Sequence, residues 1–163
     1  MKTTQTQPSW RLVLIHPVHF FAFGFGAGLS PVAPGTFGTL IAIPIFIGMS
    51  HLALWLYGVV TALFLLAGFW ICGRSSMLLG VHDHSGIVWD EIVGYLITML
   101  AAPLSWPWVA AGFVLFRLFD ILKPWPVGWA DRRLKGGIGI MMDDVFAGIY
   151  ALICMQIGLH FFG

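Results

Sequence analysis

Charged residues are scarce in this sequence, and no acidic residue occurs before Asp83. Lysine, arginine, aspartate and glutamate make up 9% of the 163 residues, whereas hydrophobic residues make up 59%. A typical soluble chain carries about 25% charged residues. Because one domain of this length cannot bury so much apolar surface, lipid must cover the excess. The composition therefore excludes an ordinary soluble domain and predicts a single integral membrane domain over residues 1–163.

Other absences narrow the range of functions. The formal net charge is +1 and no basic run occurs, which argues against a nucleic acid partner. Cys72 and Cys154 lie in apolar stretches without CxxC or CxxxH spacing, so we expect free thiols rather than a disulfide or a zinc site. The sequence also lacks a P-loop, a GxSxG nucleophile motif and the DxDxT motif of haloacid-dehalogenase phosphatases.

Long apolar runs predict an all-α polytopic membrane protein with about five membrane helices. The expected spans are residues 37–49, 52–72, 92–102, 108–119 and 145–162. Residues 10–23 are more polar, and we expect a helix that lies in the membrane interface. Basic residues are densest in residues 117–144, so we place this polar side in the cytoplasm and the C-terminus outside.

Residues 24–39 contain five glycines and two prolines, so we do not expect a regular helix across them. One interpretation is a kinked membrane segment whose small residues pack against another helix. The other is a loop whose backbone amides, together with Ser30 and Thr36, face an anionic group. Thr36 would then cap the helix that follows it. The composition does not choose between the two.

The acidic residues gather near the ends of the expected helices. Asp90 and Glu91 begin one helix, Asp120 ends the next, and Asp143 and Asp144 begin the last. A charge near lipid costs about 2.5–3.5 kcal/mol even on insertion scales, so each of these residues needs a reason to be there. Mg2+ binds carboxylate oxygens and keeps some of its waters for a substrate phosphate. We therefore predict that the five acids meet at the cytoplasmic helix ends and bind one or two Mg2+ ions.

Basic and histidine side chains nearby are candidates for binding the phosphate. Arg117 and Lys123 share a helical face with Asp120, and both can hold phosphate oxygens. Histidine prefers softer metals than Mg2+. We therefore expect His84 to act in general acid–base catalysis and His82 to hydrogen-bond the phosphate.

Simpler interpretations exist for two of these groups. Arg117 and Asp120 can form a structural ion pair within one helix. Asp131, which is followed by Arg132 and Arg133, is interpreted as part of a solvated loop rather than of a site.

Four motifs carry a resemblance to the phosphatidylglycerophosphatase A family of bacterial lipid phosphatases. They are GFGAGLSPVAPGTFGTL (24–40), GVHDHSGIVWDEIVG (80–94), AAGFVLFRLFDILKPWPVGWADR (110–132) and GGIGIMMDDVFAG (136–148). The resemblance implies an integral protein of the bacterial inner membrane. It also implies Mg2+-dependent removal of the terminal phosphate of phosphatidylglycerophosphate, which gives phosphatidylglycerol. The residues themselves indicate a metal-and-phosphate site, and the identity of the lipid comes from the resemblance.

We therefore expect a membrane phosphomonoesterase whose phospholipid substrate stays in the bilayer. A metal-activated water would attack the phosphorus, or an aspartate would form a phospho-enzyme, and the sequence leaves both routes open. The expected catalytic residues are Asp90, Glu91, His84, Asp143 and Asp144. The expected metal ligands are Asp90, Glu91, Asp120, Asp143 and Asp144. The expected substrate-binding residues are Arg117, Lys123, Ser30, Thr36 and His82.

Two other classes of function compete with this one. A small transporter or channel for divalent cations would use the acids as an ion path, but such acids should lie along the membrane depth rather than at one set of helix ends. A non-catalytic membrane scaffold leaves the concentration of acids unexplained. The sequence makes no prediction of the oligomeric state.

Overall fold

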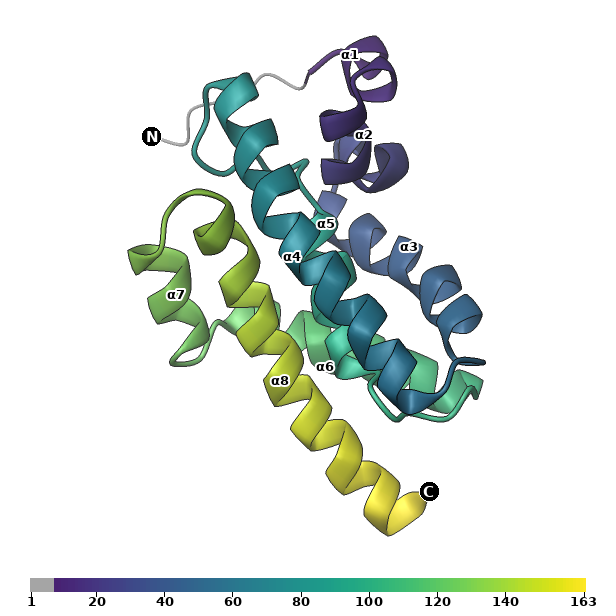
Figure 1. Cartoon of the computed structure of the whole chain (residues 1–163). Coiled ribbons are helices and arrows are strands. Elements are labelled where there is room, and N and C mark those ends of the chain that lie inside the picture. Colours follow the sequence, from purple (N-terminus) through teal and green to yellow (C-terminus); the bar gives the residue numbers. More distant parts are fainter. Residues whose placement is uncertain (1–7) are drawn as a thin grey trace.

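The protein is all-helical over residues 8–163, the part of the chain that the computed structural model describes. The predicted all-α class is therefore confirmed for these residues, which contain no strand. In chain order (Figure 1) the elements are α1 (Trp10–Ile15), α2 (Pro17–Ala22), the 3-10 helix η1 (Gly24–Leu29), α3 (Pro34–Met49), α4 (Leu54–Leu79), α5 (Trp89–Thr98), α6 (Trp106–Leu122), α7 (Val127–Arg133) and α8 (Gly136–Phe162).

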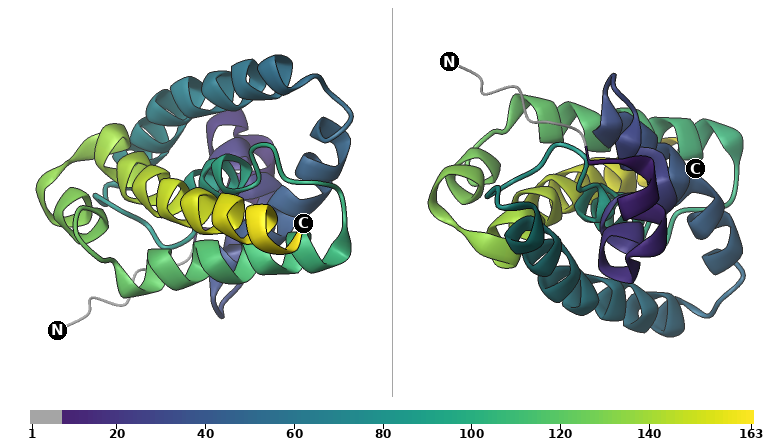
Figure 2. Two further views of the ribbon diagram at one scale, coloured as in Figure 1. Left: turned by 90° about the horizontal axis from the view of Figure 1, so that it is seen from below. Right: turned by 90° about the horizontal axis from the view of Figure 1, so that it is seen from above.

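Helix α5 forms the centre of the fold. Seen from below, it is surrounded by α3, α4, α6 and α8 (Figure 2), and eight of its ten residues are buried. Glycines allow this close packing, because a Cβ added at Gly94 would lie 2.9 Å from the Asp144 carbonyl oxygen. A Cβ added at Gly148 would similarly lie 2.6 Å from the Gly94 carbonyl oxygen. The first turn of α5, which carries Asp90 and Glu91, is thereby held inside the bundle.

Within residues 8–163, two helices are long and apolar enough to cross a membrane, namely α4 with 26 residues and α8 with 27. Helix α3 is apolar but has only 16 residues. The ten residues of α5 rise about 15 Å, which is half of a hydrocarbon core about 30 Å thick. The helix lengths thus make membrane association plausible but do not confirm five complete spans.

Helix α8 begins earlier than the sequence suggested. It starts at Gly136, so Asp143 and Asp144 lie two turns inside the helix and do not open it as predicted. Glycine is a poor helix former, but the glycines here allow close helix packing. At Gly137 an added Cβ would overlap the Phe69 carbonyl oxygen of α4. The packing between the two long helices overrides the weak helix propensity of the glycine-rich segment.

Replacing Gly137 by alanine should destabilise the protein, because the new methyl group would overlap the α4 backbone at Phe69. Overpacking of this kind costs about 1–3 kcal/mol. The thermal unfolding midpoint in detergent should therefore fall by several degrees. Gly58→Ala in α4 is the matched control, because nothing lies within 4 Å of its added Cβ. Equal midpoints for the two variants would contradict the close contact of α4 with α8.

Other boundaries differ less. Helix α4 continues to Leu79, seven residues beyond the expected end of this span at residue 72. The hairpin tip expected at Ser50-His51 is confirmed as a turn between α3 and α4. The short helix α7 was not predicted, because its sequence contains no long apolar run. The segment expected as one interfacial helix is two helices, since Pro17 begins α2 directly after α1.

The glycine-rich segment leads into α3 through an irregular turn. Positive φ angles at residues 24–26 end any regular helix there, as expected. Helix α3 then begins at Pro34, a residue favoured in the first turn because its fixed φ suits a helix. Ala33 occupies the N-cap position and Thr36 lies within the first turn. The interpretation of Thr36 as the cap was therefore wrong.

Candidate metal and phosphate site

Acidic side chains from three helices meet at one place. Asp90 and Glu91 come from the first turn of α5, Asp120 from the last turn of α6, and Asp143 and Asp144 from α8. They form two groups of three, and within each group one oxygen from each residue lies within 4.8 Å of the others. The groups are Asp90, Glu91 and Asp144, and Asp120, Asp143 and Asp144. The structure thus brings together all five predicted metal ligands.

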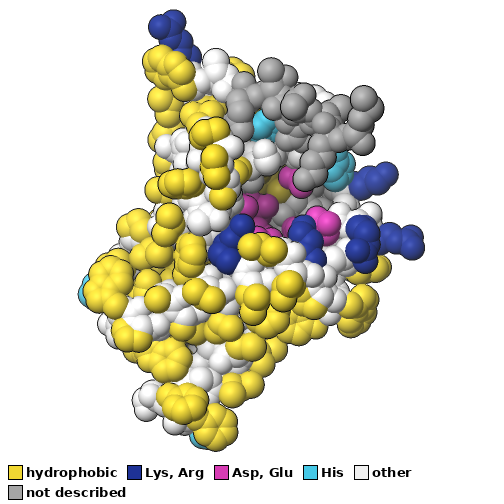
Figure 3. All heavy atoms as spheres, turned by 180° about the vertical axis from the view of Figure 1, so that it is seen from behind, with side chains coloured by type: hydrophobic (Ala, Val, Ile, Leu, Met, Phe, Trp, Pro, Cys, Tyr) yellow, Lys and Arg dark blue, Asp and Glu magenta, His cyan; other side chains and the backbone are white. Residues whose placement is uncertain are grey.

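The acids lie in a recess near the middle of α4. Figure 3 shows acidic side chains inside the recess, lysine and arginine side chains along its edge, and hydrophobic side chains over much of the same face. The indole nitrogen of Trp89 donates to the Phe64 carbonyl oxygen at 3.0 Å, which places the start of α5 beside the middle of α4. The site therefore differs from the prediction: α5 and α6 contribute acids at their ends, whereas α8 contributes them from its interior.

Two basic side chains contact the acids. Nη1 of Arg117 lies 2.5 Å from Oδ2 of Asp120 and 4.0 Å from Oε1 of Glu91. Nζ of Lys123 lies 3.1 Å from Oδ2 of Asp143. The ion pair between Arg117 and Asp120, considered as a structural alternative, is thus present. It does not prevent Arg117 from binding phosphate, because a guanidinium group has five N–H donors.

Several acidic oxygens in the site are buried without a hydrogen-bond partner among the residues that the structure describes. They are Oδ1 of Asp90, Oε2 of Glu91 and Oδ1 of Asp143. A buried charge that lacks a partner is strongly destabilising. A hard divalent cation such as Mg2+ binds carboxylate oxygens of this kind. The donor set therefore fits a divalent cation, and the unpartnered oxygens are the positions at which it would bind.

The start of α3 forms another wall of the site. A Cβ added at Gly35 would overlap Oε1 of Glu91 and lie 3.1 Å from Nη1 of Arg117. The absence of a side chain at this position therefore lets the first turn of α3 lie against both groups. The N-terminus of a helix carries a partial positive charge that favours anions. Thr36 lies in this turn, whereas the Ser30 hydroxyl donates to the Val32 carbonyl oxygen at 2.8 Å.

The two predicted histidines have different surroundings. His84 is buried, and its Nδ1 accepts a hydrogen bond from the Gly86 amide at 3.0 Å. The proton of a neutral His84 is therefore on Nε2, which is buried and has no partner. His82 is exposed, and its Nε2 accepts from the Gly136 amide at 3.3 Å. The roles of both in the reaction stay predictions.

Asp131 was missed as a member of this network. It lies on α7, and its Oδ1 is 2.6 Å from Nζ of Lys123, which also contacts Asp143. Burial disfavours the Lys123 ammonium, but the hydrogen bonds to Asp131 and Asp143 outweigh this and raise the pKa of Lys123 above its usual value. Asp131 is thus exposed, as expected, but it lies on a helix rather than in a loop and pairs with Lys123.

Replacing Asp131 by asparagine should lower kcat/KM for phosphate release only a few-fold. Lys123 would lose one of two carboxylate partners, and a partly exposed ion pair is worth about 1 kcal/mol or less. Steady-state kinetics in detergent would measure this change. Arg133→Gln on the same helix is the control, because Arg133 is exposed and belongs to neither acidic group. No change, or a loss as large as that of a metal ligand, would contradict a positioning role for Asp131.

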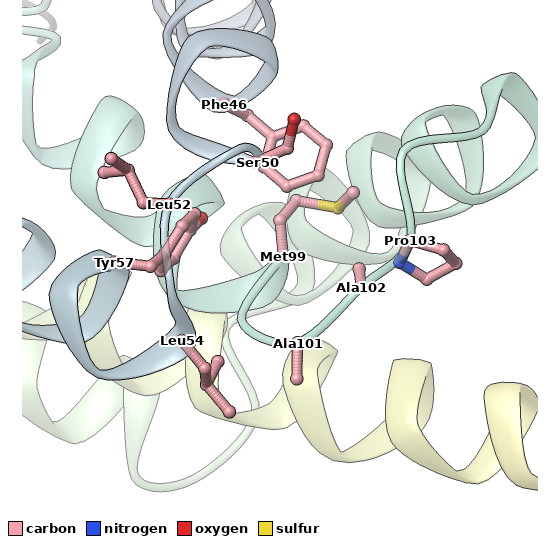
Figure 4. Close-up of a pocket in the computed structure, with 9 residues that line it drawn as sticks. All are labelled: Phe46, Ser50, Leu52, Leu54, Tyr57, Met99, Ala101, Ala102 and Pro103. Carbon is pink, nitrogen blue, oxygen red and sulfur yellow. The ribbon is translucent and has the colours of Figure 1, made fainter.

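A separate cavity of about 300 Å3 lies at the other end of α3, beside the loop between α5 and α6. Figure 4 shows that its lining is mostly apolar. The Ser50 hydroxyl donates to the Ile47 carbonyl oxygen, and the Tyr57 hydroxyl donates to the Leu96 carbonyl oxygen, both at 2.7 Å. These hydroxyls are thus already paired, and no acidic or basic side chain lines the cavity. The cavity therefore offers no charged side chain that could bind a metal ion or a phosphate.

Residues 20–159, which include every acid of the recess, match the family model described as phosphatidylglycerophosphatase A. The chain belongs to this family. Its relatives include the Escherichia coli protein named phosphatidylglycerophosphatase A, which is 49% identical over 152 residues covering 92% of this chain and 88% of that protein. The Haemophilus influenzae protein of the same name is 47% identical over 152 residues, covering 92% of this chain and 93% of that protein. The family match confirms the resemblance drawn from the four motifs.

A third relative carries a different name. This Bacteroides thetaiotaomicron protein, provisionally named a phosphatidylinositol-3-phosphatase, is 42% identical over 159 residues covering 93% of this chain and 95% of that protein. No solved structure matches the chain. The family is thus established by sequence, and its relatives are named for phosphatase activity on lipids.

Proposed function

We propose that this chain is a lipid phosphatase that hydrolyses the terminal phosphomonoester of phosphatidylglycerophosphate to phosphatidylglycerol and phosphate. The observation that carries the proposal is the convergence of five carboxylates and two basic side chains in one recess. Relatives at 47% and 49% identity, named for this activity, support the choice of lipid. They also disfavour the divalent-cation transporter, which no relative reported above is named for.

The proposed cofactor is Mg2+, held by Asp90, Glu91, Asp120, Asp143 and Asp144. A bound Mg2+ would polarise a phosphoryl oxygen and lower the pKa of a coordinated water. Arg117 would bind other phosphate oxygens through its guanidinium, and Lys123 would supply a further positive charge.

The proton transfers are assigned to the carboxylates of the recess. One carboxylate would accept the proton of the attacking water while the phosphorus–oxygen ester bond breaks, and the resulting carboxylic acid, or a solvent water, would give a proton to the departing glycerol oxygen. His84 suits hydrogen-bond donation to a phosphate oxygen better than proton abstraction, because its Nδ1 is already an acceptor for Gly86 and its Nε2 carries the proton. A phospho-aspartate would need the same cluster, and the proposal allows this route as a variant.

The acyl chains of the substrate would remain in the bilayer beside the recess. Ile121 and Leu122, which immediately precede Lys123, are 68% and 67% exposed, and Val32 before α3 is 71% exposed. Apolar side chains this exposed suit contact with lipid. The lipid headgroup would thus reach the acids while its tails lie against α3 and α6.

We further propose that the protein is a multi-pass protein of the bacterial inner membrane with the recess open to the cytoplasm. The exposed apolar faces of α4 and α8 and their lengths support membrane crossing. The basic residues between the end of α6 and the start of α8 support the orientation, since cytoplasmic segments are enriched in lysine and arginine. These are Lys123, Arg132, Arg133 and Lys135.

The purified protein in mixed detergent–lipid micelles should release phosphate from phosphatidylglycerophosphate when Mg2+ is present. Chelation should stop the release and added Mg2+ should restore it, because the carboxylates would otherwise lack the cation. Phosphatidylinositol 3-phosphate, also a lipid phosphomonoester, is the comparison substrate. Faster hydrolysis of phosphatidylinositol 3-phosphate would identify that lipid as the substrate instead. Phosphate release from neither lipid would overturn the proposal. Divalent cation flux into liposomes without hydrolysis would favour the transporter.

A further inference from the structure

The two acidic groups share one residue. Asp144 belongs both to the group with Asp90 and Glu91 and to the group with Asp120 and Asp143. Asp144 is on α8 and is only 3% exposed, and its two groups add residues of α5 in one case and of α6 and α8 in the other. A carboxylate has two oxygens and can accept bonds from two partners at once. Asp144 is thus placed to serve both groups.

Each group also has a free oxygen of its own. In the first group, Oδ1 of Asp90 is buried without a hydrogen-bond partner, and so is Oε2 of Glu91. In the second group, Oδ1 of Asp143 is buried without a partner. Asp90 is 9% exposed and Asp143 is 8% exposed, so little water reaches either. Both acidic groups therefore contain a buried carboxylate oxygen that a cation could bind.

We propose that the chain binds two divalent cations, one in each acidic group, and that the Asp144 carboxylate bridges them. This inference rests on the proposed function and extends it by fixing the number of ions and the role of Asp144. In enzymes with two metals the ions lie about 3.5–4 Å apart and stabilise both the attacking and the leaving oxygen of a displacement at phosphorus. A shared carboxylate between the ions is consistent with such a short separation.

The charges of the recess support two ions rather than one. The two groups contain five carboxylates, whereas Arg117 and Lys123 are the basic side chains that contact them. Lys123 is also shared with Asp131. One divalent cation would leave the fully ionised recess negative, which would repel a phosphate group. Two would bring it close to neutrality or above, and would allow the phosphate to bind.

Arg117 also contacts both groups. Its Nη1 lies 2.5 Å from Asp120 of the second group and 4.0 Å from Glu91 of the first. A phosphate bound between the two groups would therefore lie within reach of the guanidinium. Asp120 and Glu91 keep Arg117 beside both ion positions.

Binding of Mn2+ to the purified full-length protein in detergent would test the proposal independently of activity. Electron paramagnetic resonance should count two bound Mn2+ ions in the native chain and show the coupling expected of neighbouring spins. Asp90→Asn and Asp120→Asn should each bind one ion and lose the coupling. Asp144→Asn should weaken both sites, because it removes the shared ligand. Asp131→Asn, which changes a carboxylate outside both groups, should still bind two ions.

Each result decides between the alternatives. A native stoichiometry of one, or an Asp144→Asn variant that loses only one of two ions, would overturn the bridged pair. Circular dichroism and size-exclusion chromatography would show whether each variant keeps its fold. One bound ion with Mg2+-dependent phosphate release would leave the proposed function standing and reject the second ion. Two coupled ions without hydrolysis of any lipid phosphomonoester would retain the metal pair and reject the proposed function.

Discussion

Asparagine in place of Asp144 should reduce kcat/KM for phosphate release by about 10³-fold or more, since metal ions contribute several kcal/mol of transition-state stabilisation at such sites. Asparagine keeps the shape of the side chain but removes the negative charge that both acidic groups share. The reduction should appear in a steady-state phosphate-release assay with saturating Mg2+. Among single acidic substitutions, this one should have the largest effect on activity.

Stability measurements would separate lost chemistry from lost structure. The five acids repel one another when no cation is bound. In chelator, Asp144→Asn should therefore unfold at the same temperature as the native chain or at a higher one. Added Mg2+ should stabilise the native chain more than the variant, because ligands that bind only the folded state raise its stability. Substantial activity in the variant, with normal stability, would remove Asp144 from the reaction.

A carboxylate outside the two acidic groups provides the control for this substitution. Asp83 lies on the loop between α4 and α5, interacts electrostatically with Lys123, and belongs to neither acidic group. Asp83→Asn makes the same chemical change near the same end of α5 and should keep most of the activity. A loss as severe as that of Asp144→Asn would mean that the loop, rather than the two acidic groups, carries the chemistry.

The convergence of the acids was predictable because acids are so rare in this chain. The chain has only seven acidic residues in 163, and five of them, Asp90, Glu91, Asp120, Asp143 and Asp144, lie near the ends of the expected membrane helices. A shared site at these helix ends was the simplest reason for their presence. The helices that carry them were predictable from apolar runs, although their ends were not. Helix α8 begins seven residues before Asp143, where Gly137 packs against the α4 backbone, a tertiary contact that no local pattern reveals.

The position of Asp131 and the end of α5 were not predictable for a related reason. Beside Arg132 and Arg133 in the sequence, Asp131 looks like a solvated residue. It reaches Lys123 because the chain turns through Pro124 and Pro126 and then forms α7. The short length of α5, ten residues, was not predictable either, because its end at Thr98 falls within an apolar run that continues to residue 102.

Lysine in place of Arg117 should lower kcat/KM by about 10²-fold while leaving the fold nearly as stable, since removing one preorganised donor from a developing oxyanion costs about 10²–10³-fold. Lysine keeps the positive charge that Asp120 and Glu91 require. It lacks the planar fork that binds two phosphate oxygens at once. Kinetics with phosphatidylglycerophosphate and thermal unfolding in detergent would measure the two effects separately.

Inhibition by inorganic phosphate would decide between the two roles considered for Arg117. If its guanidinium binds phosphate, Arg117→Lys should weaken this inhibition together with the reaction, whereas Mn2+ binding should change little. If the ion pair with Asp120 is purely structural, the phosphate inhibition constant should stay the same and only the unfolding temperature should fall. The side chain contacts both acidic groups, and one of its nitrogens, Nε, is buried without a partner. This free donor favours the first outcome, because it is available to an incoming phosphate oxygen without breaking either ion pair.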